Sequence, residues 1–266
     1  MNLNGKCAVV TGGAHGIGRA LAERLAQEGM CVVVADLNAE RAERVAKRIN
    51  GLAVVCNVGD PSAINDLVRR AEEAFGPVHV FCSNAGFSDR RPGLEETVEE
   101  VTELVNVNLL SHVWAAQAVV PGMIERGEGY IVQTISSASL ITGPSGMGYT
   151  LTKHGALGFA EWLALNYAHK GVHVTCLCPN AVNTGMMGRN EDDGSSALSD
   201  ELRASIGDIV EPELCADMTL DAMRDGKFLV LPHPRVGESF LRKATDYDKW
   251  IEGTNRRLRR MAGEDV

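Results

Sequence analysis

The sequence lacks long hydrophobic runs, an excess of basic residues and a leader-like amino terminus. No apolar stretch approaches the roughly 18 residues of a membrane span. The opening residues, MNLNGKCAVV, contain no long apolar segment of the kind found in signal peptides. Lys and Arg number 26 against 35 Asp and Glu, a net charge of −9, whereas binding to a phosphate backbone needs clustered cations. We therefore expect no membrane and no nucleic-acid partner.

Disulfide and metal-ligand patterns are also missing. The seven cysteines are an odd number and most stand inside apolar runs, which is typical of reduced, buried thiols in a reducing compartment. We therefore expect a cytoplasmic protein. The seven histidines show no H-E-x-x-H or similar spacing. Cys176 and Cys178 share one face of an expected strand, where core packing explains them better than a metal does. The sequence predicts no metal site.

What the sequence does contain is an alternation of short apolar runs and longer helical patterns. The apolar runs are residues 7–11, 31–35, 53–56, 78–83, 130–135, 173–178 and 228–231. The helical patterns are residues 18–28, 39–49, 61–75, 96–126, 149–169 and 212–224. Continuously apolar strands that alternate with helices are typical of a parallel sheet covered on both faces. The pattern predicts one α/β domain over residues 1–266, with a doubly wound sheet of about seven strands.

Two segments depart from this alternation. Residues 185–210, which include NEDDGSSALSD, form either a solvated surface insertion or a loop over a binding site. The tail from about residue 239 has helical spacing and ends in the basic cluster RRLRR, residues 256–260. We interpret that cluster as a solvated helix face, with a subunit contact as the alternative.

The first apolar run leads directly into TGGAHGIG, Thr11 to Gly18, and then into a helical pattern. Glycines allow a tight turn and let backbone N–H groups approach a pyrophosphate, and the helix N-terminus favours that anion. Asp36 closes the second run, 18 residues after Gly18, where a carboxylate can accept both ribose hydroxyls of an adenosine. These features predict a Rossmann-type dinucleotide site.

Further motifs follow at the ends of later runs. SNAG ends the fourth run, Asn108 stands in VNVNLLS, and Ser136 lies 13 residues before Tyr149. Tyr149 and Lys153 form Y-x-x-x-K, and CPNAVNT follows the sixth run. Together with T-G-x-x-x-G-I-G, this ordered set resembles the short-chain dehydrogenase/reductase family over about residues 5–235.

The sequence departs from the family pattern at three places. SNAG replaces the usual NNAG, and Asn57 stands where many relatives carry an Asp against the adenine amino group. An amide oxygen can still accept that bond. Asn180 replaces the glycine that usually follows the proline of the motif after the sixth strand, which would reshape the wall beside the nicotinamide.

The resemblance implies a role for each motif residue. Tyr149 would move the hydroxyl proton, Lys153 would hold the nicotinamide ribose, and Ser136 would hold the substrate oxygen. Asn108 would support a water-linked proton relay. The cofactor residues would be Gly12, His15, Gly16, Ile17, Gly18, Asp36, Leu37, Asn57, Val58, Asn84, Ala85, Gly86, Tyr149, Lys153, Pro179, Val182 and Thr184. The substrate residues would be Ser136, Phe87, Leu140, Met186 and Met187.

Three of these assignments have a rival. Ser137 adjoins Ser136, but neighbouring strand residues face opposite ways and the 13-residue spacing favours Ser136. Asn106 competes with Asn108, which the family pattern favours because its Asn directly precedes the Leu. Plain packing explains the two methionines about as well as a substrate contact.

The chemistry accounts for the spacing of Tyr149 and Lys153. Residues four apart share one face of a helix. A tyrosine with an ordinary pKa near 10 needs a decrease of roughly 3 units to exchange protons near neutral pH. A nearby ammonium and the positive nicotinamide ring of an oxidised cofactor both favour the phenolate.

These residues predict an NAD-dependent oxidoreductase that interconverts a small secondary alcohol and a ketone. Asp36 would repel the 2′-phosphate of NADP, and Leu37 and His15 stand where relatives that use NADP usually carry Arg or Lys. The alternatives are an NADPH-linked ketoacyl or carbonyl reductase and a nucleotide-sensing relative without catalysis. The helical patterns at 96–126 and 149–169 are apolar around much of their circumference. They predict burial on a second side, in a homotetramer or a homodimer.

Overall fold

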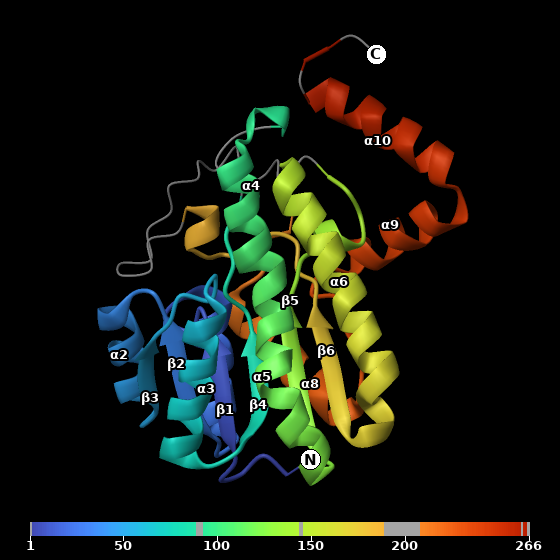
Figure 1. The fold of residues 1–266 in the computed structure, drawn as a ribbon. Helices are drawn as coiled ribbons and strands as arrows, with labels where there is room; N and C mark the ends of the chain where they lie inside the picture. The colour runs from blue at the N-terminus through green and yellow to red at the C-terminus, as the bar shows by residue number, and fades with distance from the viewer. Residues whose placement is uncertain (1, 89–92, 144–145, 189–207, 262, 265–266) are drawn as a thin grey trace.

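A computed structural model describes residues 2–88, 93–143, 146–188, 208–261 and 263–264 of the chain. Its centre is a seven-stranded sheet in the order β3-β2-β1-β4-β5-β6-β7, in which all neighbouring strands run parallel (Figure 1). The strands are β1 Cys7–Thr11, β2 Cys31–Asp36, β3 Leu52–Val55, β4 Val78–Ser83, β5 Gly129–Thr134, β6 Val172–Leu177 and β7 Leu229–Val230. The expected doubly wound parallel sheet is confirmed.

Helices cover both faces of the sheet because side chains alternate along each strand. In β1, Cys7 and Val9 belong to one core cluster, while Ala8 and Val10 belong to the other. Helices α3 (Pro61–Phe75), α5 (Ser111–Arg126) and α6 (Met147–Tyr167) pack on the first face. Helices α1 (Gly16–Gln27), α2 (Ala39–Arg48) and α8 (Pro212–Asp225) pack on the second. Both faces of the central strands β1 and β5 are buried, as their apolar sequences predict, whereas the edge strand β3 is only partly covered.

The expected helix at 96–126 begins at Val98 and is not uniform. Helix α4 (Val98–Val105) continues through a π-helical turn, Asn106–Leu110, into α5. Val98–Arg126 is long and apolar enough to cross a membrane, but a core helix of a folded domain has the same properties. Here α5 packs on the sheet through Ala115, Val119 and Met123, which are all buried. The π-helical turn holds about one residue more than an α-helical turn, and it contains Asn108, one of the expected site residues.

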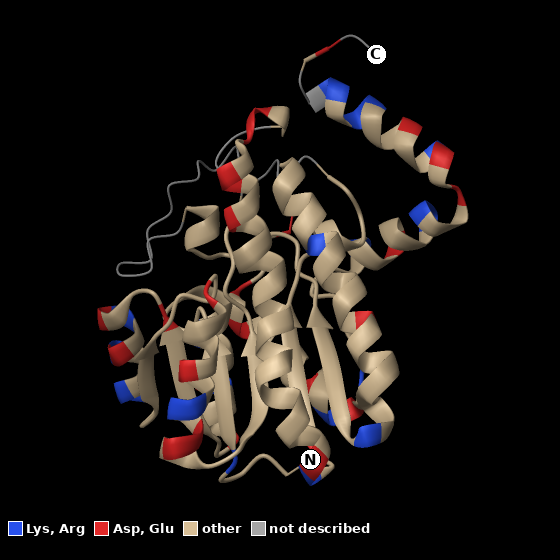
Figure 2. Ribbon diagram, viewed as in Figure 1, with Lys and Arg blue, Asp and Glu red and all other residues tan. Residues whose placement is uncertain are grey.

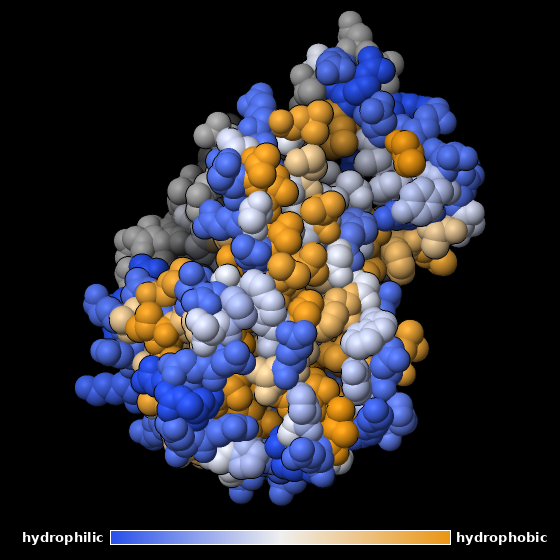
Figure 3. Space-filling view, in the orientation of Figure 1, coloured by the Kyte–Doolittle hydropathy of each residue, from blue (hydrophilic) through white to orange (hydrophobic). Residues whose placement is uncertain are grey.

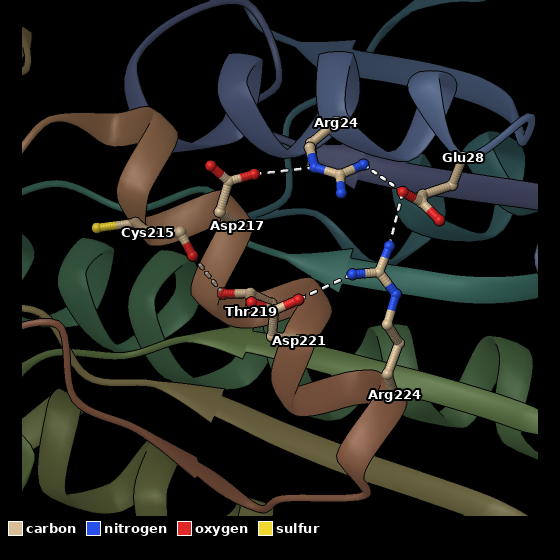
Figure 4. A network of polar contacts seen from close by, with 7 residues as sticks. All are labelled: Arg24, Glu28, Cys215, Asp217, Thr219, Asp221 and Arg224. Atoms are coloured by element: carbon tan, nitrogen blue, oxygen red, sulfur yellow. Dashed lines mark hydrogen bonds and ion pairs between the residues drawn. The ribbon is translucent and has the colours of Figure 1, made fainter.

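Helices α1 and α8 lie side by side on the second face and are joined by charged residues near their ends (Figure 4). Arg24 Nε donates to Asp217 at 2.9 Å, and Arg24 also pairs with Glu28. Arg224 bridges Glu28 at 2.7 Å and Asp221 at 2.8 Å. The two guanidinium groups hold the pKa of the Glu28 carboxyl below its usual range. This network fixes the helix that carries the glycine loop relative to the C-terminal part of the fold.

The chain ends in two helices, α9 (Pro234–Thr245) and α10 (Tyr247–Met261). Helix α9 reaches the core through Val236, and the Lys243 ammonium donates to the Leu140 carbonyl at 2.9 Å. Helix α10 extends away from the sheet (Figure 1), and none of its residues from 247 to 260 is buried. The expected helical tail is therefore two helices, of which only the first is anchored in the fold.

Candidate active site

A cavity of about 520 Å³ opens at the carboxyl ends of the strands, where the strand order reverses between β1 and β4. Open α/β sheets bind ligands at this position because the loops that follow neighbouring strands diverge there. All seventeen residues expected at a cofactor line this cavity. Their positions agree with the expectation, and their binding roles stay predictions.

The glycine loop forms one wall. Gly12 and Gly16 have φ values of 61° and 52°, which favour glycine. At Gly18, a Cβ would lie 2.0 Å from the Gly12 carbonyl oxygen, so a larger residue does not fit. Helix α1 then begins with no side chain capping its N-terminus and no acidic residue in its first turn. The first backbone N–H groups of α1 are therefore available to bind an anion in the cavity.

Asp36 stands at the end of β2 and is 8% exposed. One carboxylate oxygen accepts from the Ala14 N–H at 3.1 Å, and the other accepts from the Asn38 N–H at 3.0 Å. Each oxygen keeps a further lone pair for another donor. The carboxylate thus holds the glycine loop in place and faces the same cavity.

Two residues tie the glycine loop to the end of β4. The Thr11 hydroxyl accepts from Asn84 N at 2.9 Å and Ala85 N at 3.1 Å. The Asn84 side chain donates to Thr11 O at 3.0 Å. The sequence identified Asn84 but gave Thr11 only as the start of the glycine motif, because its partners lie more than 70 residues away.

Tyr149 and Lys153 enter the cavity from the first turns of α6. The Lys153 ammonium lies 5.4 Å from the centroid of the Tyr149 ring and donates to the Thr134 carbonyl at 3.4 Å. Burial lowers the pKa of Lys153 to about 8, and the neighbouring Cys178 thiol offsets part of that effect. An ammonium near a phenol favours the phenolate form of that phenol.

A buried histidine lies behind this pair. His112, in the first turn of α5, is 1% exposed, and burial together with the Lys153 charge lowers its pKa to about 3. It is therefore neutral, and neither ring nitrogen has a hydrogen-bond partner among the described residues. The sequence showed no signal for it, since its burial depends on how α5 meets the sheet.

Ser136 and Ser137 face different surroundings. Ser136 lines the cavity, and its hydroxyl accepts from Ala138 N at 3.1 Å. Ser137 turns away, and its hydroxyl donates to Asn180 Oδ1 at 3.3 Å. Of the two serines, Ser136 therefore faces the cavity, and its contact with a substrate stays a prediction.

Asn108 occupies the π-helical turn and is fully buried. Its Oδ1 accepts from Phe87 N at 3.0 Å, and its Nδ2 donates to Phe87 O at 2.7 Å. A Cβ at Gly86 would lie 3.0 Å from Asn108 Oδ1, which explains the glycine. The side chain of Asn108 therefore supports the loop after β4 from behind, and it is not among the residues that line the cavity.

The expected substrate residues are divided. Phe87, Met186 and Met187 line the cavity. Leu140 does not: it is 2% exposed and packs in the core cluster on the α5 face. Of the expected loop at 185–210, residues 189–207 lie outside the described residues. The sequence analysis missed five lining residues, Cys56, Glu103, Val107, Thr134 and Ile135, whereas Asn180 lines the cavity as expected. Glu103 and Val107 precede Asn108 on the same long helix. The face of this helix that points toward the site is the sequence signal that could have identified them.

Comparison with known proteins decides the family. The model of the short chain dehydrogenase family matches residues 6–194. The chain belongs to the short-chain dehydrogenases. It is 37% identical over 193 residues to a 4-formylbenzenesulfonate dehydrogenase of Comamonas testosteroni, covering 70% of this chain and 77% of that one. It is 32% identical over 228 residues to a cyclohexanol dehydrogenase of Acinetobacter, covering 84% of this chain and 89% of that one.

Solved structures of short-chain dehydrogenases share the fold. One from Burkholderia phymatum, in complex with NAD, superimposes with a TM-score of 0.83 at 26% identity, covering 93% of this chain and 96% of that chain. The matched family region contains the glycine loop and the Tyr149–Lys153 pair. The chain is therefore an oxidoreductase of this family, with dehydrogenase relatives that act on alcohols.

Proposed function

We propose that the protein is an NAD-dependent dehydrogenase that interconverts a secondary alcohol and a ketone, with Tyr149 as the group that exchanges the hydroxyl proton. The observation that carries this proposal is one cavity that joins the glycine loop and Asp36 to Ser136, Tyr149 and Lys153. A nucleotide-sensing relative without catalysis would have no use for the last three residues in one place.

The residues fit a nicotinamide dinucleotide. The uncapped N-terminus of α1 suits a pyrophosphate, and Gly18 allows the start of that helix to pack closely against the Gly12 backbone of the glycine loop. Asp36 suits the adenosine ribose, and Lys153 suits the nicotinamide ribose. When bound, the cofactor supplies the acceptor for the hydride that leaves the substrate carbon.

The chain's own residues then position the substrate and manage its proton. The Ser136 hydroxyl, held in place by Ala138 N, donates a hydrogen bond to the substrate oxygen. The Tyr149 phenolate takes the hydroxyl proton during oxidation, and the phenol returns it during reduction. Lys153 is buried, so its ammonium acts through a low-dielectric medium and lowers the proton affinity of Tyr149.

The test is a panel of structurally varied secondary alcohols with NAD⁺ and, in parallel, NADP⁺, followed by the absorbance of the reduced cofactor. Turnover with NAD⁺ supports the proposal. Reduction of ketoacyl substrates with NADPH alone would instead favour the reductase alternative. Tight nucleotide binding without turnover of any alcohol or ketone would favour the sensor.

The proposal includes a homotetramer or homodimer of single-domain subunits in the cytoplasm. Apolar residues gather over α4, α5 and α6 (Figure 3), and charges are sparse along α5 and α6 (Figure 2). Leu151, Trp162 and Leu165 on α6 are 57%, 51% and 82% exposed, which favours burial against a second copy. All seven thiols are unpaired, in keeping with a reducing compartment. Multi-angle light scattering that returned the monomer mass would contradict the assembly.

A further inference from the structure

His233 lies beneath the loop that forms one wall of the cavity. It follows β7 as the N-terminal flanking residue of α9, and it is 5% exposed. Its ring contacts the backbone of the loop at two points: Asn180 N lies 3.1 Å from Nδ1, and Ala181 O lies 3.1 Å from Nε2. One imidazole therefore bridges two successive residues of a loop 52 or 53 positions away in the sequence.

These contacts define the protonation of the ring. The Asn180 backbone nitrogen can only donate, so Nδ1 must accept and carries no proton. Nε2 then carries the proton and donates it to the Ala181 carbonyl. A ring protonated at both nitrogens would place two donors against each other at Asn180. The geometry thus requires a neutral imidazole in one tautomer.

The bridged loop is part of the cavity wall. Pro179, Asn180, Val182 and Thr184 all line the cavity. Apart from the single bridge between Val182 and Val210, this segment belongs to no strand, so its backbone groups depend on outside partners.

The loop has further supports besides His233. Ser137 N donates to Pro179 O at 2.7 Å, and Val210 N donates to Ala181 O at 3.1 Å. The Ser137 hydroxyl holds the Asn180 side chain. His233 is the support that reaches the backbone of Asn180, the residue that stands in place of the family's glycine. It also connects the cavity wall to α9, which the family match to residues 6–194 does not include.

We propose that His233 is a positioning residue that fixes the nicotinamide end of the cofactor site by holding the Asn180–Ala181 backbone. The inference rests on the proposed function, since it takes a nicotinamide dinucleotide as the ligand. The adenosine end, at Asp36 and the glycine loop, has its own hydrogen bonds and does not involve His233. Loss of the bridge is therefore a local defect at one end of an elongated site.

The experiment compares His233→Leu and His233→Gln, with titration calorimetry of NAD⁺ and of ADP-ribose, which lacks the nicotinamide. Leucine removes both hydrogen bonds and leaves the Asn180 N–H without its acceptor, whereas the Ala181 carbonyl keeps the bond from Val210 N. Glutamine offers one acceptor and one donor. We expect His233→Leu to raise the Kd for NAD⁺ by about 10-fold or more, with the Kd for ADP-ribose within about 2-fold. We expect His233→Gln to recover most of the loss.

The control is His79→Leu, the same replacement near the amino end of β4, which should change neither Kd. Equal weakening of both ligands by His233→Leu, or of neither, would overturn the inference. If that variant does not fold, the ¹⁵N spectrum of the imidazole in the intact protein decides. An unprotonated Nδ1 whose signal shifts with NAD⁺ but not with ADP-ribose supports the bridge, and a protonated Nδ1 overturns it. An unmodified protein that binds neither ligand would instead refute the proposed function, and the inference with it.

Discussion

Cofactor choice follows from the carboxylate at the end of β2. Asp36 is buried, and hydrogen bonds from Ala14 N and Asn38 N hold both of its oxygens, so it cannot swing away from a ligand. NAD presents two neutral ribose hydroxyls that can donate to it. NADP presents a phosphate with a charge near −2 at pH 7. At about 4 Å and an effective dielectric of 20, each pair of unit charges costs roughly 4 kcal/mol before screening.

Screening by solvent and relaxation of the protein reduce this repulsion energy, but even a fraction of it is enough to decide the cofactor preference. We expect kcat/KM for NAD to exceed that for NADP by at least about 10²-fold, or ~2.7 kcal/mol. Asp36→Ala should lower the ratio of kcat/KM for NAD to kcat/KM for NADP. It should also weaken the binding of NAD, because the Ala14 N–H loses its hydrogen-bond acceptor. Adding Leu37→Arg should narrow the ratio further or reverse it, since Leu37 is 70% exposed and the longer side chain has room.

The assay is initial-rate kinetics with both cofactors at one alcohol concentration. Asp221→Asn is the matched control: its side chain is 70% exposed, pairs with Arg224 and does not line the cavity, so the replacement removes a negative charge away from the site. The ratio of kcat/KM for NAD to kcat/KM for NADP should be the same in Asp221→Asn as in the unmodified protein. Equal use of NAD and NADP by the unmodified protein would refute the reasoning, because Asp36 would then not face the ribose.

Three further predictions follow from the site. Tyr149→Phe should lower kcat by at least about 10²-fold in steady-state assays while NAD binding persists, with Tyr167→Phe near the parent rate; a loss of only a few-fold contradicts the mechanism. Gly18→Ala should abolish NAD binding in calorimetry, because its Cβ would meet the Gly12 carbonyl at 2.0 Å, whereas Gly158→Ala, in open space, should not. The lowered pKa of Lys153 means that this residue binds more protons in the unfolded chain between pH 8 and 10.5, so its own contribution to stability should rise with pH there, by up to roughly 3 kcal/mol, against the opposite contribution of the buried thiols, whose pKa values burial raises. Urea unfolding of Lys153→Met should lack that rise, and parallel curves for the two proteins would refute it.

The sheet was predictable because a parallel strand covered on both faces leaves a continuous apolar run. The first run, 7–11, matches β1 as observed, and the second differs only by inclusion of Asp36. The last strand is shorter than its run, since only Leu229 and Val230 pair with β6. Apolar character alone does not say where a neighbouring strand stops pairing.

The site was predictable where a residue's role depends on local spacing. Tyr149, Lys153 and the glycines fall in this group. The π-helical turn at Asn108 was not predictable, because the periodicity of a long helix averages over a single added residue. Leu140 was misplaced for a similar reason. Its apolar side chain suits a substrate, but the short 3₁₀ turn Ser137–Ser139 directs it into the core.

Helix α10 gives the chain a region of distinct stability. A 15-residue helix with no side chain buried between 247 and 260 gains almost nothing from the core, and isolated helices of this length are marginal in water. Its backbone amides should therefore exchange with solvent at rates close to those of an unfolded peptide, while the amides of β1, β4 and β5 exchange only on global unfolding. Exchange measured by mass spectrometry would show this contrast directly. Protection of the 247–260 amides that grows with protein concentration would mark α10 as a segment that a second copy stabilises.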